Sequence, residues 1–146
     1  MVEGGNASLI ASAIQQKKAP GTGTYGTTSA QVIDPEGLPV QINFFELAAV
    51  PIYVSLTIQP LTGYVSTTGQ AAVAAVVAFI NSLAIGQTLY YNWLLGVAGL
   101  NGNPLGLTFA VTVLLIGTSL GPLSPTSVTI PFNAAARCST VTLIGG

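Results

Sequence analysis

The feature that most constrains this chain is a run of 90 residues, Leu47 to Ala136, that contains no charged side chain. Charged residues make up 5% of the whole sequence, against about 25% in ordinary soluble domains. Apolar residues make up 50%. Exposed apolar patches of unusual size mark interaction surfaces, and permanent interfaces resemble a hydrophobic core cut in half. The composition therefore predicts a module whose surface is largely covered by neighbouring subunits.

Ionisable groups are too few for most enzyme chemistry. The chain has no histidine, three cations, four anions and a net charge of −1. General acid–base catalysis near neutral pH relies on His, Asp, Glu, Lys, Tyr or Cys, and a nucleophile needs a base beside it. An active site would require Asp34, Glu36 or Glu46 to converge on a pocket, whereas the first two are typical of a solvated turn. We therefore predict a chain that is not an enzyme, with no catalytic residues, no cofactor and no small-molecule substrate.

The few charged residues and the single cysteine also bear on the partners of the chain and on its redox compartment. Nucleic-acid binding needs clustered Lys and Arg, and here only Lys17 and Lys18 are adjacent, so we predict no nucleic-acid partner. The single cysteine, Cys138, excludes an intramolecular disulfide and a cysteine cluster for zinc. It is expected to be a small, partly buried apolar residue. One unpaired cysteine also fits assembly in a reducing cytoplasm.

Two alternative functions stay open at this point. A membrane-associated module is suggested by the apolar segment Ala71–Gly86. A spanning helix needs about 20 predominantly apolar residues, and this segment is shorter, has a polar break at Asn81-Ser82 and lacks flanking Lys or Arg. We predict no membrane insertion. A carbohydrate-binding module would use aromatic rings that are scattered over different predicted elements: Tyr25, Tyr53, Tyr64 and Trp93.

The first third of the chain predicts a helix followed by a β-hairpin. Asn6 or Ser8 begins the helix as its N-cap, and Pro20-Gly21 ends it. Strands at 30–33 and 40–47 flank the turn Asp34–Gly37, because Asp accepts backbone hydrogen bonds, Pro presets φ and Gly supplies a positive φ. The apolar stripe of the helix is expected to consist of Leu9, Ile10, Ala13 and Ile14.

The uncharged region predicts one strand, two helices and three further strands. Residues 50–59 alternate apolar and semi-polar positions, as in a strand with one buried face. A helix capped by Thr67 or Thr68 follows and ends at Ile85-Gly86, and a third helix is capped by Thr88. Strands are predicted at 105–116, at 127–132 and at 140–144, with 133–137 crossing back. The second helix is expected to bury Val73, Val76, Val77, Ile80 and Leu83, and the third Leu89, Trp93, Val97 and Leu100.

Several residues of these helices and strands are candidates for an interface. The second helix carries mostly alanine on its other face, where a solvent-facing helix would normally carry charges, so we expect both faces to be covered. Tyr and Trp combine a large apolar area with a polar tip, a mix enriched at interfaces. Trp93 is expected in the core, with an interface role as its alternative. The candidate interface residues are Tyr53, Ala71, Ala74, Ala75, Ala78, Tyr90, Tyr91 and Trp93.

Length and element order together predict the fold class. A chain of 146 residues has the size of one domain. Strands and helices come in blocks rather than in alternation, which is typical of α+β folds with mainly antiparallel pairing. We therefore predict a mainly antiparallel sheet packed against two or three helices, in a single domain over residues 1–146.

Short motifs in order along the chain carry a resemblance to a known family. They are Val2-Glu3-Gly4-Gly5-Asn6 before Ala13-Ile14, Pro20-Gly21, Tyr25-Gly26-Thr27, Asp34 and Gly37 before Val40 and Phe44, Val50-Pro51-Ile52-Tyr53-Val54, and Ile85-Gly86 before Tyr91 and Leu94. The ordered set resembles the C-terminal part of the baseplate J family, the wedge subunits of contractile phage tails. The likeness covers Val2 to about Leu100. Family members are about twice as long or more, so the chain is expected to be the C-terminal module of a longer natural protein, or a variant reduced to that module.

The resemblance implies a structural role and no catalytic residues. Such subunits pair with copies of themselves and with other baseplate wedge and hub proteins around the tail. The implied location is the virion tail baseplate, or a related contractile injection machine, assembled in the cytoplasm of the bacterial host.

Overall fold

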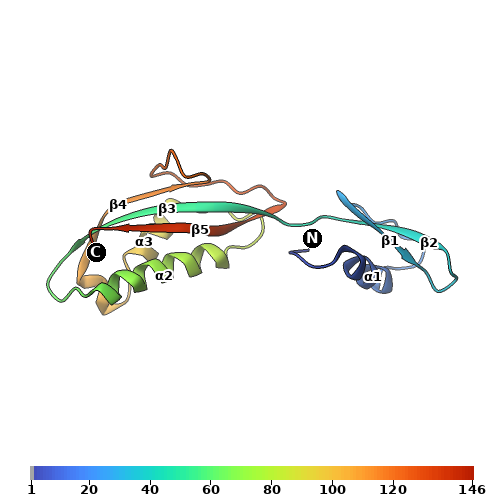
Figure 1. The fold of residues 1–146 in the computed structure, drawn as a ribbon, viewed down its shortest axis with the longest axis horizontal. Helices are drawn as coiled ribbons and strands as arrows, with labels where there is room; N and C mark the ends of the chain where they lie inside the picture. The colour runs from blue at the N-terminus through green and yellow to red at the C-terminus, as the bar shows by residue number, and fades with distance from the viewer. Residues whose placement is uncertain (1) are drawn as a thin grey trace. The chain divides into compact units, whose positions relative to one another are not determined.

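Over residues 2–146, which the structure describes, the chain forms three α-helices, one short 3₁₀ helix and five strands in two sheets (Figure 1). The structure is a computed structural model. Its contacts divide the chain into two compact units, Met1–Ala48 and Ala49–Gly146. The predicted α+β class with mainly antiparallel pairing is confirmed. That residues 1–146 form one domain stays a prediction.

The N-terminal unit packs one helix on a two-stranded hairpin. The helix α1 (Ala7–Lys17) begins at Asn6. The Asn6 Oδ1 atom accepts hydrogen bonds from the backbone nitrogen of Ser8 at 2.9 Å and from that of Leu9 at 3.3 Å. Asn6 is therefore the cap, one of the two residues predicted for that role.

The buried stripe of α1 has a different phase from the predicted one. Ala11 is fully buried, with Ile10 and Ile14 packed against the same cluster. Leu9 is 72% exposed and Ala13 is also exposed, so both predictions were wrong. Apolar residues occupy most positions between 7 and 14, so the sequence allows more than one helical stripe, and packing against the hairpin selects one.

The predicted hairpin turn is confirmed, but its strands end at different residues from those predicted. Strand β1 (Thr28–Ile33) pairs antiparallel with β2 (Pro39–Phe44). The Asp34 carboxylate accepts a hydrogen bond from the Leu38 nitrogen at 2.7 Å, and the Asp34 carbonyl accepts one from the Gly37 nitrogen at 3.0 Å. Gly37 has a φ of 84°, the left-handed conformation that favours glycine. The position of Asp34 is thus explained locally by turn chemistry.

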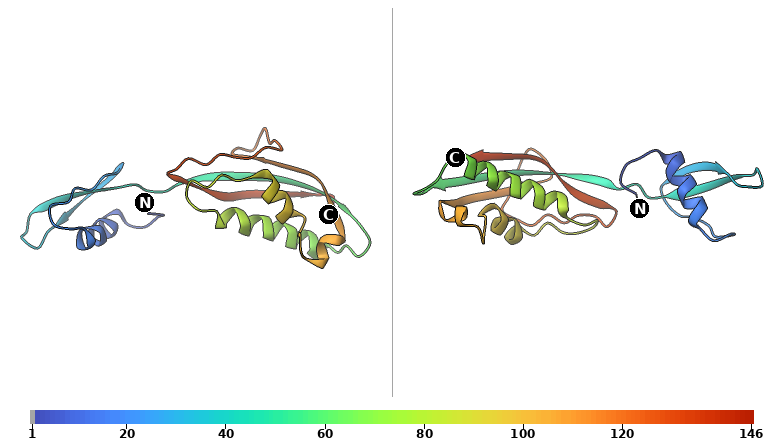
Figure 2. Two further views of the ribbon diagram at one scale, coloured as in Figure 1. Left: turned by 180° about the vertical axis from the view of Figure 1, so that it is seen from behind. Right: turned by 90° about the horizontal axis from the view of Figure 1, so that it is seen from below.

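The C-terminal unit is a three-stranded sheet with helices on one face (Figures 1 and 2). The central strand is β3 (Ala48–Pro60), between the edge strands β4 (Phe109–Gly117) and β5 (Ala134–Ile144). Strand β4 is antiparallel to β3, whereas Figure 1 shows β5 running in the same direction as β3. The predicted alternation of β3 is confirmed, because the buried side chains are Ile52, Val54, Leu56 and Ile58.

The helix α2 (Ser66–Ser82) supplies much of the covering layer. Val76 and Ile80 are fully buried as predicted, and so is Leu83 just after the helix. Val73 and Val77 are only half-buried. The N-cap is Val65 and makes no side-chain hydrogen bond, so the predicted threonine cap was wrong.

The helix α3 (Tyr91–Ala98) starts later than predicted, which rotates its buried face. Leu89 does not belong to the helix, because its backbone pairs with Val128 in an isolated antiparallel bridge. The buried helical residues are Leu94 and Ala98, while Trp93 is 49% exposed. The predictions of a cap at Thr88 and of Trp93 in the core were therefore wrong.

A β-bulge shifts the alternation of β4. The predicted strand at 105–116 begins only at Phe109, since the 3₁₀ helix η1 (Pro104–Leu107) precedes it. Thr57 pairs with Val113 and Ile58 with Val111, which leaves Thr112 as an extra residue. An extra residue in one strand moves the following side chains to the other face. As a result Leu114 and Ile116 are buried, whereas Val113 is exposed and Leu115 half-buried.

The last two predicted strands are replaced by one. Residues 127–132 form no strand in the described structure, although Ile130 is buried. Strand β5 starts at Ala134 and includes residues 134–137 of the segment predicted to cross back. A single 11-residue strand is therefore the last element of the fold and forms an edge of the sheet.

Candidate functional site

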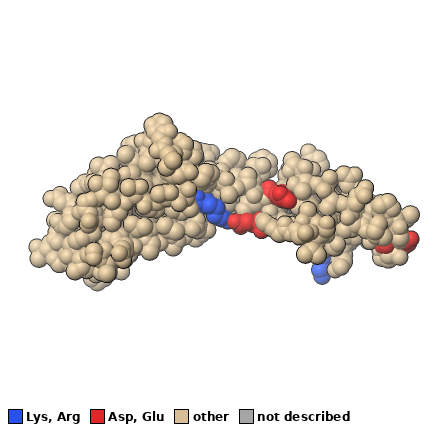
Figure 3. Space-filling view, in the orientation of Figure 1, with Lys and Arg blue, Asp and Glu red and all other residues tan. Residues whose placement is uncertain are grey.

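The charged residues are divided unequally between the two units. Arg137 is the one charged residue among residues 49–146. On the face drawn in Figure 3, a few blue and red side chains stand on a surface that is otherwise tan, which means uncharged. A folded unit of nearly a hundred residues with one charged side chain is unusual for a soluble domain.

Large apolar side chains are exposed on this uncharged unit. Several exceed 45% exposure, the highest being Leu107 at 82%, Leu120 at 81% and Phe132 at 77%. Single exposed apolar residues are ordinary, but these occur on a unit with one charge. The exposed large apolar residues of the unit are Leu61, Val65, Ile85, Tyr90, Trp93, Leu105, Leu107, Val113, Leu120, Phe132 and Ile144.

The alanine face predicted on the second helix is partly open. Ala74 and Ala78 are exposed, and Ala71 and Ala75 are half-buried. Ala72 is fully buried against the sheet and does not belong to this face. Exposed alanines leave little bulk between the helix backbone and an approaching surface, which suits close packing by a neighbour.

The aromatic candidates differ in their surroundings. Tyr90 and Trp93 are 48% and 49% exposed, and their rings meet edge to face with centroids 4.6 Å apart. Tyr91 instead packs against the core, and its backbone nitrogen donates to Ser127 Oγ at 3.0 Å. Tyr53 is half-buried on the side of β3 opposite to the buried residues. The structure brings Tyr90 and Trp93 together but does not place all the aromatic candidates in one cluster.

The four aromatic residues considered for carbohydrate binding do not stack on one another. Tyr25 meets Phe45 at 5.7 Å, and Tyr64 meets Phe109 at 6.4 Å, in different units. No observation in the described structure assembles them into one platform for a sugar ring.

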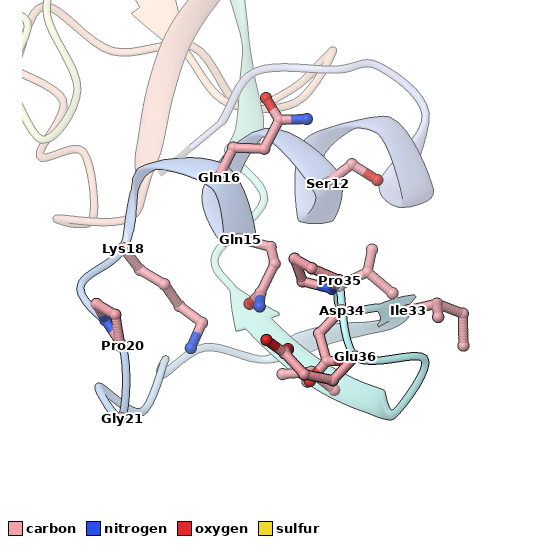
Figure 4. A pocket seen from close by; sticks show the side chains of 12 residues that line it. Ser12, Gln15, Gln16, Lys18, Pro20, Gly21, Ile33, Asp34, Pro35 and Glu36 are labelled. Atoms are coloured by element: carbon pink, nitrogen blue, oxygen red, sulfur yellow. The ribbon is translucent and has the colours of Figure 1, made fainter.

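A hollow of the N-terminal unit lies between α1 and the hairpin turn (Figure 4). Its volume is about 860 Å³. Asp34 and Glu36 lie on one side and Lys18 on the other, with Gln15 pointing between them. Lys18 Nζ donates to the Thr22 carbonyl at 3.1 Å, while Gln15 Oε1 is buried without a hydrogen-bond partner among the described residues. Two of the three carboxylates considered for catalysis thus share a hollow, and Glu46 does not line it.

A smaller hollow lies in the C-terminal unit, between α3, the following turn and β4. Its volume is about 450 Å³, and its polar lining residues are Asn92 and Asn101. Among residues 2–146, no three His, Cys, Asp or Glu side chains lie close enough together to hold a metal ion.

Cys138 lies on β5 and is half-buried, with its side chain packed against the core. Burial raises the pKa of the Cys138 thiol above its ordinary value, because a thiolate loses hydration in an apolar site. This agrees with the predicted role of a partly buried apolar residue.

Comparison with protein-family models and with curated proteins found no match for this chain. The resemblance to the baseplate J family therefore stays a prediction that rests on the ordered motifs. Within residues 2–146, every helix is too short or too polar to cross a bilayer.

Proposed function

We propose that this chain is a structural subunit of the baseplate wedge of a contractile tail, in a phage or in a related injection machine. Its role is to assemble with copies of itself and with other wedge and hub proteins around the tail hub. In this role the chain catalyses no reaction and binds no cofactor or small-molecule substrate.

The observation that carries the proposal is the composition of the C-terminal unit's surface. It exposes large apolar side chains while carrying one charged residue. Exposed apolar surface of unusual extent marks interaction sites, and obligate interfaces have this apolar character. A subunit held permanently among others meets that condition.

The family motifs support the same role. Gly26, in the Tyr25-Gly26-Thr27 motif, lies against the backbone of Phe44, where a Cβ atom would overlap it. The Asp34–Gly37 motif forms the hairpin turn described above. The structure of the hairpin therefore requires the residues of both motifs, and neither motif contributes a reactive group.

The test is the composition of purified tail particles. Contractile tails or injection machines are isolated from cells that express the chain naturally, and mass spectrometry then searches the particles for its peptides. Recovery in fixed proportion to the other wedge proteins is expected. The purified chain is expected to form oligomers by light scattering coupled to size exclusion. A chain that is absent from the particles and monomeric at high micromolar concentration would refute the proposed function.

A further inference from the structure

The two edges of the C-terminal sheet differ in how they are covered. On the outer side of β4, Ile116 and Ser124 exchange two backbone hydrogen bonds of 2.9 Å, so a returning segment covers part of that edge. Strand β5 has β3 as its one strand neighbour, and no isolated bridge of residues 2–146 lies along it. The outer edge of β5 is therefore the open edge of this sheet.

The first part of β5 is held by α2 and the segment that follows it. The Gly86 nitrogen donates to the Ala134 carbonyl at 2.8 Å. The backbone nitrogen of Cys138 donates to Asn81 Oδ1 on α2 at 2.9 Å. From Thr140 to Ile144, no second strand and no isolated bridge among residues 2–146 covers the edge opposite β3. Native proteins protect open edges with Lys, Pro or short strands. Residues 138–144 contain neither a charged residue nor a proline, so this edge keeps a row of backbone groups able to pair with another strand.

The open alanines of α2 lie beside the same edge. Asn81 is seven residues after Ala74 and three after Ala78, so the three side chains share one helical stripe. Since Asn81 reaches the backbone of β5, this stripe faces the edge of the strand.

A second contact shows that helix and strand run side by side. A Cβ atom on Gly69 would stand 2.9 Å from Leu143 Cδ2. The helix from Gly69 to Asn81 is about 18 Å long, and the strand from Cys138 to Leu143 is about 17 Å long. The matching lengths place α2 along β5 over this whole stretch, in the opposite direction.

We propose that a second copy of this chain docks on the composite surface formed by the outer edge of β5 (Thr140–Ile144) and the Ala74–Ala78 stripe of α2. The two β5 strands pair antiparallel about a two-fold axis and join the two sheets into one. An axis perpendicular to the sheet keeps both α2 helices on the same face, where their alanines allow close approach. The inference deepens the proposed function and rests on it, since it locates the self-association that the function requires.

Charge and side-chain chemistry favour a copy of the chain as the occupant. Antiparallel pairing of the whole open segment places Thr142 opposite its own copy and Thr140 opposite Ile144. Threonine pairs across strands are favourable. The charged residue of the strand, Arg137, lies outside the paired segment, so like charges are not brought face to face.

The test compares charge on the two edges of the sheet in the full chain. Thr142→Lys puts a cation next to its copy at the axis, and Val113→Lys puts the same charge on an exposed position of β4. Light scattering and sedimentation are expected to show that Thr142→Lys weakens self-association by about tenfold or more, while Val113→Lys does not. Unchanged melting temperatures show that both variants are folded.

A cross-linking experiment tests the register independently of stability. In a Cys138→Ser background, Thr142→Cys is expected to give a disulfide-linked dimer on mild oxidation, because facing residues in an antiparallel pair have Cβ atoms about 5 Å apart. Thr112→Cys on β4 is the matched control and should cross-link far more slowly.

The outcomes separate this inference from the proposed function. Equal effects of the two lysine variants, together with equal cross-linking of the two cysteines, would overturn docking at β5. If the chain still self-associates and is present in tail particles, the proposed function survives that failure. A chain that does not self-associate overturns the β5 inference, and the particle composition alone then decides the function.

Discussion

Thr68→Val is expected to make the protein more stable, because Thr68 buries a hydroxyl that has no partner. The side chain is 1% exposed, and its Oγ1 atom makes no hydrogen bond in the described structure. An unsatisfied buried polar group costs about 1–3 kcal/mol. Valine keeps nearly the same shape with a methyl group in place of the hydroxyl, and its helix propensity is similar. We expect the free energy of unfolding to rise by about 1–2 kcal/mol.

Urea denaturation followed by circular dichroism measures this change. With a slope of about 2 kcal/mol per molar urea, the midpoint should rise by about 0.5–1 M. Thr67→Val is the matched control, because Thr67 is exposed on the same turn of α2 and its hydroxyl is free to contact water. That variant should change stability by no more than about 0.5 kcal/mol. A Thr68→Val protein that is no more stable than the wild type would show that the hydroxyl is satisfied, for example by a buried water, and would refute the reasoning.

Three further predictions follow from other parts of the fold. Gly26→Ala should disrupt the N-terminal unit, because its Cβ would overlap the backbone of Phe44, which cannot move aside as a side chain can. Hydrogen exchange of the backbone amides measures this: β1 and β2 should lose protection, and full protection would contradict the prediction. Asn6→Ala should lower the free energy of unfolding by about 1 kcal/mol through loss of the α1 cap, whereas Asn6→Asp should retain it. The Cys138 thiol should react with iodoacetamide more slowly than a free cysteine at pH 8, because its raised pKa leaves less thiolate at any pH below that value. The reaction rate should rise with pH and, in denaturant, reach that of a free thiol. A folded protein that reacts as fast as free cysteine would contradict the buried site.

Interactions between residues close in sequence were enough to predict several elements of the fold. The hairpin turn follows from Asp34 and Gly37, since their side-chain acceptor and positive φ act within a few residues. The cap at Asn6 acts over two and three residues. The strand β3 follows from strict alternation over its central residues, 52–58. Each of these signals is complete within one short segment, so no distant contact is needed to predict it.

The elements that sequence alone misplaced depend on contacts between distant segments. The helix α3 begins at Tyr91 because its first backbone donor is met by Ser127 and because Leu89 pairs with Val128. The bulge at Thr112 exists only in the pairing of β4 with β3, and it decides which apolar residues of β4 are buried. A periodic apolar pattern cannot reveal an extra residue that is defined by a partner strand.

The candidate interface shows the same division. The absence of charge from Leu47 to Ala136 is a property of the sequence alone, and it already predicts that neighbours cover this region. Which alanines of α2 are open, and that they lie beside the free edge of β5, follows only from the tertiary structure, through the contact of Asn81 with Cys138. Composition determines how much apolar surface the chain has, because it counts side chains wherever they are. Only the packing of helices on the sheet decides where that surface remains exposed, since burial depends on which segments meet.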